Sequence, residues 1–331
     1  MPKFVMLDSQ KLFGADAGIE LNRNMLNAHG IDVVMAECKN DEDIFKVAAD
    51  ADAIGVAFQK IDGPIMDGLK KCRVIVRYGI GYEGVAVHEA TMRGIAVCNL
   101  PDYCIPDVAT HTQGMILDCC RKLTFLNRKM REGTWNAACG YRISRLSNLK
   151  LGLIGFGNIA RKLVDYMKPY NMRILAYDPY LNADVFSRMG VKQTTLDDLL
   201  AKSDIISLHT PLTKETEHII NSANIAKMKE GVMIVNTARG PVVSLDDLCD
   251  GLKSGKIKAA ALDVMEGEPD IPADHVIFSY ENVILTPHSA FTSVESEIEM
   301  HEKVAKAVLD VLSGDLPHNC LNRKELQERA G

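Results

Sequence analysis

Short runs of apolar, mostly β-branched residues recur along the chain and alternate with stretches whose apolar positions have helical spacing, such as 18–29 and 65–71. In the first half of the chain, five runs have the length of buried strands: residues 3–7, 32–35, 53–57, 73–77 and 95–98. Strands that alternate with helices predict a parallel sheet with helices packed on its faces.

A second alternation of the same kind begins near Leu149. Ser244, followed by Asp246 and Asp247, is typical of an N-cap with an acidic first turn, and it predicts a helix that ends before Gly255. Six parallel strands with intervening helices would complete one doubly wound unit. The six expected strands cover residues 149–154, 173–177, 205–208, 232–236, 259–263 and 283–285.

The last long helical stretch, about 295–312, comes after the last expected strand. Two sheets along the chain, followed by a returning C-terminal helix, indicate one domain that is interrupted by another. Candidate hinges are residues 99–106, which contain two prolines, and the segment just after His288.

Composition and charge narrow the possible functions. The 331 residues are 47% hydrophobic and 25% charged, which are ordinary values for a globular protein of about two domains. The net charge of −6, without runs of Lys or Arg, predicts no nucleic-acid partner and no anionic-membrane partner. No stretch approaches the roughly 18 apolar residues of a membrane helix, and we expect no signal peptide.

Nine cysteines are scattered along the chain, without a C-x-x-C motif and with one adjacent pair, Cys119–Cys120. This pattern predicts reduced thiols that fill the core as small apolar residues in a cytoplasmic protein. The histidines show no ligand-like spacing, so we expect no metal site.

A glycine motif follows the strand expected at 149–154. Gly155, Gly157 and Ala160 form G-x-G-x-x-A, in which the first glycine permits a tight turn and the second lets the backbone approach a pyrophosphate. The helix that begins there offers free N–H groups to phosphates. Asp178 ends the next strand, 23 residues after Gly155, where a carboxylate binds ribose hydroxyls and repels a 2′-phosphate. The motif therefore predicts NAD rather than NADP.

Three later strand ends carry polar residues that suit hydride transfer to a keto acid. They are Arg239 in Asn-Thr-Ala-Arg-Gly, Glu268 in Met-Glu-Gly-Glu-Pro, and His288 in Thr-Pro-His-Ser-Ala. A guanidinium binds a carboxylate with two donors and polarises a ketone, and an imidazolium supplies the proton. A carboxylate paired with the imidazolium stabilises it and fixes its orientation. Each residue alone also fits a structural role, but the ordered trio favours catalysis.

With these motifs in view, the sequence resembles the D-isomer-specific 2-hydroxyacid dehydrogenase family over nearly the whole chain. The resemblance implies an α/β fold of two doubly wound parallel-sheet domains. In it, a Rossmann NAD-binding domain, residues 103–292, is inserted in a flavodoxin-like substrate-binding domain made of residues 1–102 and 293–331. The motifs that carry the resemblance begin at Arg77, Gly155, Ser207, Asn236, Ala261 and Thr286.

The resemblance also implies roles for individual residues. The catalytic residues of the family correspond to Arg239, Glu268 and His288, and its substrate-carboxylate loop corresponds to Tyr78, Gly79 and Ile80, with Arg239 as a further substrate contact. Its cofactor contacts, besides the glycine turn, correspond to Asn158, Ile159, Asp178, His209, Thr237, Ala238 and Asp263.

The sequence departs from the family at Thr110, where members often carry an acid. Nearby, Thr112 matches a position that reaches the cofactor phosphates, although a hydroxyl near a helix start is also a simple cap. The resemblance further implies a homodimer built on the cofactor domains, and the apolar helix 112–120 is a plausible contact element, unless it packs inside its own domain.

Two classes of function fit these observations. The first is an NAD-dependent oxidoreductase that interconverts a small 2-keto acid and a (2R)-hydroxy acid. The second is a non-catalytic NAD-sensing protein of the corepressor type, which shares the loop that starts at Arg77. Because all three expected catalytic residues are present, we favour the enzyme. The identity of the keto acid stays open, since pocket shape sets it.

Overall fold

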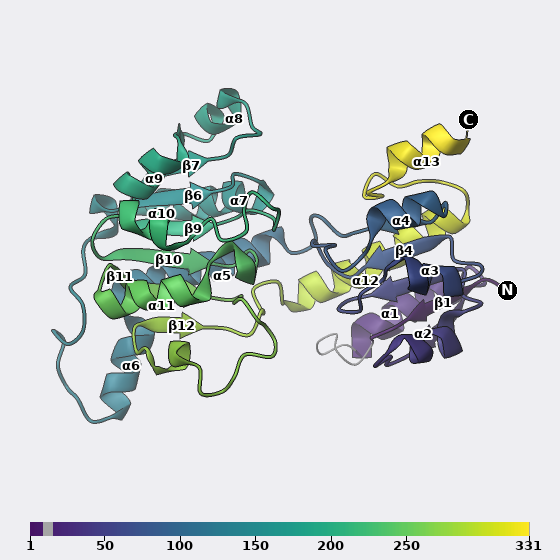
Figure 1. The fold of residues 1–331 in the computed structure, drawn as a ribbon, viewed down its shortest axis with the longest axis horizontal. Coiled ribbons are helices and arrows are strands. Elements are labelled where there is room, and N and C mark those ends of the chain that lie inside the picture. The colour runs from purple at the N-terminus through teal and green to yellow at the C-terminus, as the bar shows by residue number, and fades with distance from the viewer. Residues whose placement is uncertain (9–15, 331) are drawn as a thin grey trace. The chain divides into compact units, whose positions relative to one another are not determined.

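The computed structural model describes residues 1–8 and 16–330, and the chain forms two compact units (Figure 1). Unit 1 comprises Met1–Tyr103 and Ser293–Gly331, and unit 2 comprises Cys104–Thr292. The chain therefore passes from one unit to the other twice, and unit 1 is built from both ends of the sequence.

Unit 1 contains a five-stranded parallel sheet with the order β2-β1-β3-β4-β5. This is the flavodoxin-like order of a doubly wound sheet, and it confirms the predicted fold class. The apolar runs form the buried strands: β3 and β5 are buried along their whole length, and β1 and β4 are buried except for one end residue each. The strands are β1 (Lys3–Met6), β2 (Asp32–Met35), β3 (Ala53–Val56), β4 (Val74–Arg77) and β5 (Ala96–Cys98).

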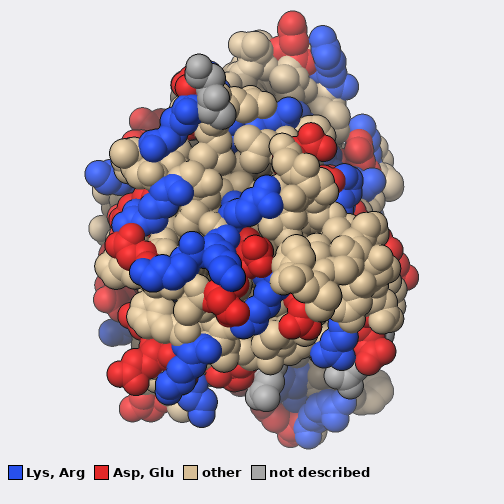
Figure 2. Space-filling model, turned by 90° about the vertical axis from the view of Figure 1, so that its right-hand side faces the viewer, with Lys and Arg blue, Asp and Glu red and all other residues tan. Residues whose placement is uncertain are grey.

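Six helices accompany the sheet among the described residues of unit 1: α1 (Asp16–Asn27), α2 (Asp41–Ala48), α3 (Gly63–Gly68), α4 (Val87–Met92), α12 (Val294–Leu312) and α13 (Arg323–Ala330). The long helix α12 packs against α1 and β4. Ser293 and Ser296 form a capping box that begins α12. Figure 2 shows basic and acidic side chains interspersed over the face that it draws.

Unit 2 contains a seven-stranded parallel sheet with the order β12-β11-β10-β9-β6-β7-β8. The order reverses between β9 and β6, and ligands of open α/β sheets bind outside the carboxyl ends of the strands at such a point. The sequence pattern missed β8, because both of its residues are exposed. The strands are β6 (Lys150–Ile154), β7 (Arg173–Tyr177), β8 (Lys192–Gln193), β9 (Ile205–Leu208), β10 (Val232–Asn236), β11 (Ile257–Leu262) and β12 (Val283–Leu285).

The helices of unit 2 cover both faces of this sheet (Figure 1). Helix α11 begins as predicted, because the Ser244 side chain accepts a hydrogen bond from the Asp247 N–H, and it ends at Gly255. The α-helices are α5 (Ile105–Arg121), α6 (Leu123–Arg131), α7 (Asn158–Met167), α8 (Ala183–Arg188), α9 (Leu196–Lys202), α10 (Ser222–Lys227) and α11 (Leu245–Ser254). Short 3₁₀ turns are η2 (Leu146–Asn148), η3 (Lys168–Tyr170), η4 (Gly240–Val242) and η5 (Val276–Ser279).

The apolar residues of helix α5 face the interior of unit 2. Met115, Ile116, Cys119 and Cys120 belong to the buried core, and α5 packs against α7. This packing favours the alternative that segment 112–120 packs inside its own domain. Its apolar character is explained by packing within its own unit.

Candidate functional site

The glycine turn between β6 and α7 has the geometry that its sequence predicts. Gly155 has φ 88°, and a Cβ there would lie 2.5 Å from the His209 carbonyl oxygen, so the position requires glycine. Gly157 is the N-cap of α7, and a Cβ built on it would meet no atom within 4 Å. The backbone at the start of α7 is therefore open to a close-approaching ligand such as a pyrophosphate.

Asp178 follows β7 and lies against this turn. Its carboxylate oxygens accept hydrogen bonds from the Phe156 N–H at 2.9 Å and the Tyr180 N–H at 3.0 Å. These bonds fix the acid beside the glycine turn, where a ribose would lie. In the first turn of α7, Asn158 is exposed and accepts a bond from Arg161, while Ile159 is half-buried.

Three further expected cofactor contacts lie at neighbouring strand ends. His209 follows β9, and its Nε2 lies 2.9 Å from the Ser207 hydroxyl oxygen. Burial lowers the pKa of His209 to about 4, so its imidazole is neutral at physiological pH. Thr237 follows β10 and shares a hydroxyl–hydroxyl bond of 2.8 Å with Thr112, while the Ala238 N–H donates to the Asn236 side chain.

Thr112 is not a helix cap, because α5 begins seven residues earlier at Ile105. Its buried hydroxyl donates to the Val108 carbonyl at 2.7 Å and links α5 to Thr237. Thr110, which departs from the family pattern, is exposed, and its hydroxyl donates to the Pro106 carbonyl at 2.8 Å.

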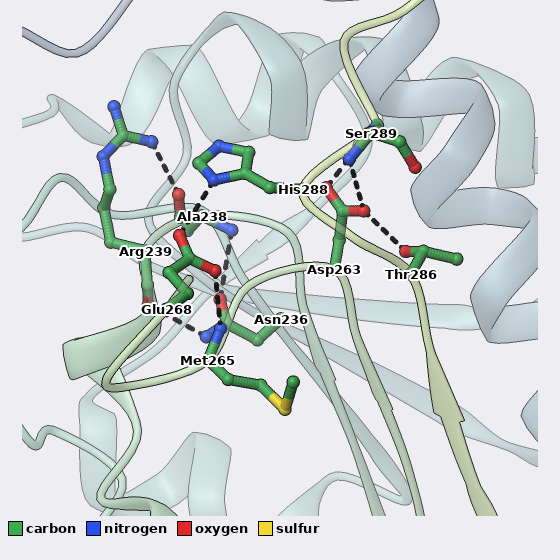
Figure 3. Close-up of polar contacts among 10 residues, drawn as sticks. Asn236, Ala238, Arg239, Asp263, Met265, Glu268, Thr286, His288 and Ser289 are labelled. Atoms are coloured by element: carbon green, nitrogen blue, oxygen red, sulfur yellow. Dashed lines mark hydrogen bonds and ion pairs between the residues drawn. The ribbon is translucent and has the colours of Figure 1, made fainter. Parts of the chain in front are cut away.

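Arg239, Glu268 and His288 lie on loops that follow three adjacent strands, β10, β11 and β12. Nδ1 of His288 lies 2.8 Å from Oε1 of Glu268, and the other Glu268 oxygen accepts from the Met265 N–H at 3.0 Å. Figure 3 shows the imidazole pointing toward this carboxylate, with Arg239 on the neighbouring loop. The Arg239 guanidinium donates to the Ala238 carbonyl at 2.6 Å. The structure thus brings the predicted trio into one region of unit 2.

Close packing between loops holds the trio in place. A Cβ at Gly240 would lie 2.2 Å from the backbone carbonyl of Met265, so the loop that carries Arg239 packs directly on the loop that carries Glu268. A second pair, His218 and Glu266, joins these loops to the segment after β9, with Nε2 and Oε1 2.8 Å apart.

Asp263 holds the loop that carries His288. Its carboxylate accepts hydrogen bonds from the Thr286 hydroxyl at 2.5 Å and from the N–H groups of Ser289 and Ala290 at 2.9 and 3.0 Å. These bonds keep His288 at φ 51°, a left-handed conformation that non-glycine residues rarely adopt. The sequence identified Asp263 only as a cofactor contact. Its strand-end position gave no signal that these loop donors would bind its carboxylate.

Two contacts at the site were not predicted from the sequence. Nε2 of His111, on α5, lies 3.1 Å from the Thr286 hydroxyl oxygen on the loop that carries His288. Asn236 donates to the Arg239 carbonyl at 2.9 Å and so orders the loop after β10.

The predicted carboxylate loop belongs to unit 1 and follows β4. Tyr78 is buried, Gly79 has φ 142°, and the Gly79 carbonyl accepts from the Leu100 N–H at 2.9 Å. Asn99 donates to the Ile80 carbonyl at 2.6 Å. Within the described part of the chain, the Ile80 N–H has no hydrogen-bond partner, so it remains available to an anion.

Two kinds of feature are absent from the part of the chain that the structure describes, residues 1–8 and 16–330. No helix there is both long enough and apolar enough to cross a membrane. In those ranges, no group of three or more His, Cys, Asp or Glu side chains is placed to hold a metal ion.

The fold and the glycine turn define a dinucleotide-binding α/β protein, and comparisons with known proteins specify its class. The model of the D-isomer specific 2-hydroxyacid dehydrogenase NAD-binding domain matches residues 113–290. The chain belongs to this family, and it is an NAD-dependent 2-hydroxyacid dehydrogenase with NAD as its cofactor.

Relatives and solved structures cover almost the whole chain. A glyoxylate reductase of Thermofilum pendens is 36% identical over 307 residues, 90% of each chain. A hydroxypyruvate reductase of Thermotoga maritima is 37% identical over 87% of this chain and 94% of its own. The D-lactate dehydrogenase of Aquifex aeolicus, solved with NAD and lactic acid, superposes with a TM-score of 0.83 at 26% identity, covering 98% of both chains.

Proposed function

We propose that the enzyme interconverts a small 2-keto acid and the corresponding (2R)-hydroxy acid, with His288 as the proton donor and acceptor. The observation that carries this proposal is the 2.8 Å contact between Nδ1 of His288 and Glu268. It leaves Nε2 of the same ring without a protein partner among the described residues, so that nitrogen is available to a substrate oxygen.

The three side chains have complementary tasks in reduction. The Arg239 guanidinium offers parallel donors that suit a carboxylate, and its charge stabilises the oxygen of the ketone as that oxygen becomes an alkoxide. Nε2 of His288 holds the proton that this oxygen receives, while Glu268 stabilises the imidazolium from the other side of the ring. In the opposite direction, neutral His288 accepts the hydroxyl proton. NAD, when bound, supplies or accepts the hydride.

The residues around the glycine turn fit this cofactor. Gly157 and the first turn of α7 offer open backbone to the phosphates, and Asp178 is fixed where ribose hydroxyls would lie. Thr112, Thr237, Ala238 and His209 line the neighbouring strand ends as further candidate contacts.

Two observations favour a small keto acid as substrate. The relatives described above are named for glyoxylate and hydroxypyruvate. On the proposed carboxylate loop, the available Ile80 N–H suits a carboxylate. The test is kcat/KM with NADH across about ten 2-keto acids of increasing size. We expect the highest values for the two- and three-carbon acids. NADH binding without turnover of any keto acid would instead indicate an NAD-sensing protein.

The preference for NAD should depend on the charge of Asp178. We expect Asp178→Asn to lower the ratio of kcat/KM for NADH to that for NADPH by about tenfold, equivalent to about 1.4 kcal/mol of lost charge repulsion. The amide keeps an oxygen that can accept from the Phe156 N–H, so the glycine turn is retained. Asp178→Ala should show the same loss of discrimination. An unchanged ratio in both variants would contradict this role.

We also propose a homodimer that uses the segment from α6 to Ile143. Helix α6 has no buried side chain, and Leu123, Met130 and Trp135 are 60%, 46% and 88% exposed. Light scattering should give twice the 36.4 kDa mass of one chain. Combining Leu123→Asp with Trp135→Asp should give the single-chain mass, whereas Tyr180→Asp, at an equally exposed aromatic residue elsewhere in unit 2, should not. A wild-type mass of one chain would exclude the dimer.

A further inference from the structure

Two cysteines of unit 1 lie directly opposite each other across an antiparallel bridge. The segment that follows α12 runs along the free edge of β5 and pairs Cys320 with Cys98. The Leu321 N–H donates to the Val97 carbonyl at 2.7 Å, and the Asn99 N–H donates to the Asn319 carbonyl at 3.2 Å. Because these bonds flank the pair, Cys98 and Cys320 form a non-hydrogen-bonded pair, the kind whose Cα atoms are about 4.5 Å apart.

This arrangement meets the geometric requirement of a disulfide. Cα separations of about 4.4–6.8 Å can be bridged, and both cysteines of the bridge are free and buried. Asn322 fixes the register, because its buried side chain accepts from the Val97 N–H and donates to the Ile95 carbonyl at 2.9 Å. The two sulfur atoms can therefore meet without a rearrangement of the fold.

The two thiols differ in pKa and exposure, so Cys320 is expected to react before Cys98. The hydrogen bond from Cys98, assisted by the nearby Arg323 charge, lowers the pKa of Cys320, whereas the pKa of Cys98 is raised. Cys320 is 5% exposed and Cys98 is fully buried. A cavity of about 540 Å³ is lined by Asn319 and Arg323, on either side of Cys320 in sequence. Two ion pairs, Lys303–Asp102 and Lys306–Asp310, lie in the lining of this cavity, so its charges are largely balanced.

We propose that Cys98 and Cys320 are a site of reversible disulfide formation by exchange with a small-molecule disulfide of the glutathione class. The Cys320 thiolate attacks one sulfur of the reagent and displaces the first thiolate, which leaves a mixed disulfide. Cys98 then attacks the Cys320 sulfur and displaces the second. Two protein thiols are oxidised, the reagent is reduced to two small thiols, and the two protons go to those products.

The disulfide would act on the proposed carboxylate loop. Cys98 precedes Asn99, which donates to the Ile80 carbonyl at 2.6 Å, and Leu100 donates to the Gly79 carbonyl. A disulfide would restrain the backbone at Cys98, directly before Asn99, and so alter how Asn99 holds this loop. We infer that oxidation raises KM for the keto acid more than it lowers kcat. This second part rests on the proposed function, whereas disulfide formation does not.

The test incubates the full-length enzyme with oxidised glutathione and analyses a non-reducing tryptic digest by mass spectrometry. Peptides 94–121 and 307–323, which carry the two cysteines, should appear joined, with fragment ions that place the bond at Cys98. Dithiothreitol should separate them. Cys98→Ser and Cys320→Val should each remove the joined peptide, whereas Cys249→Ser, at another buried cysteine, should retain it. Absence of the joined peptide from the wild-type enzyme would overturn the proposal.

The kinetic arm compares oxidised and reduced wild-type enzyme. We expect KM for the best keto acid to rise at least twofold on oxidation, to return after reduction, and to stay constant in Cys320→Val. A joined peptide with unchanged KM would overturn the coupling to the loop. If no keto acid is turned over at all, the proposed function fails, while the peptide analysis still decides whether the disulfide forms.

Discussion

Replacing His288 with alanine is expected to lower kcat for 2-keto acid reduction by a factor of roughly 10²–10⁴, the usual contribution of a positioned general acid. The variant loses the nitrogen that delivers the proton, while Gly155, Gly157 and Asp178 remain in place. NADH affinity, measured by fluorescence titration, should therefore stay within about twofold of the wild-type value. His29→Ala, which removes an exposed histidine of unit 1, is the control and should keep full activity.

The same assignment predicts opposite pH dependences for the two directions. Reduction needs the imidazolium and oxidation needs the neutral imidazole, so raising the pH should slow reduction and speed oxidation. Glu268→Gln keeps the shape of the side chain and removes the negative charge that stabilises the imidazolium, so kcat for reduction should fall at neutral pH. An unchanged kcat for reduction in Glu268→Gln would contradict the role of Glu268. Near-normal kcat in His288→Ala would contradict that of His288.

Changing Arg239 to lysine should lower kcat/KM by a factor of about 10²–10³, as the loss of a positioned electrostatic donor commonly does. An ammonium is a point charge and does not reproduce the two parallel donors of a guanidinium. The loop itself should persist, because Asn236 binds the Arg239 backbone carbonyl rather than its side chain. Steady-state kinetics should show both a lower kcat and a higher KM for the keto acid.

Arg188→Lys provides the matched control, because Arg188 is exposed at the end of α8. Its kinetic constants should equal those of the wild type. If Arg239→Lys also retained full kcat/KM, the carboxylate would have to be bound elsewhere, and the Ile80 N–H would then be the principal candidate.

Sequence patterns predicted the strands that carry an apolar run, including β2, none of whose residues is fully buried, and missed the strand without such a run. Strands such as β9 and β10 are buried along their whole length, so their apolar runs are unambiguous. Strand β8 consists of the exposed residues Lys192 and Gln193 and carries no such signal. The signal for a strand is therefore its run of apolar residues, which is clearest where burial on both faces leaves the chain little choice of residue.

In the candidate site, the sequence predicted which residues lie together but not the hydrogen bonds that hold them. The identities of Arg239, Glu268 and His288 at strand ends were sufficient to predict that they lie together, because carboxyl ends of parallel strands share one edge of a sheet. The partners of Asp263 and Thr112 were not predictable, since they depend on loop conformation and on the register of α5 against β10. Those bonds join residues 23 to 125 positions apart in the sequence.

Because unit 1 is built from two separate segments of the chain, its folding cannot be completed until the second segment has been synthesised. Unit 2 is continuous, so all of its strands are available once Thr292 has been made. Unit 1 is not: its N-terminal sheet is synthesised first, but α12, which packs on α1 and β4, comes from the far end of the chain. Until that helix emerges, an apolar face of the first 103 residues stays open to solvent. The segment of the chain that is made first is thus the last to acquire its full core.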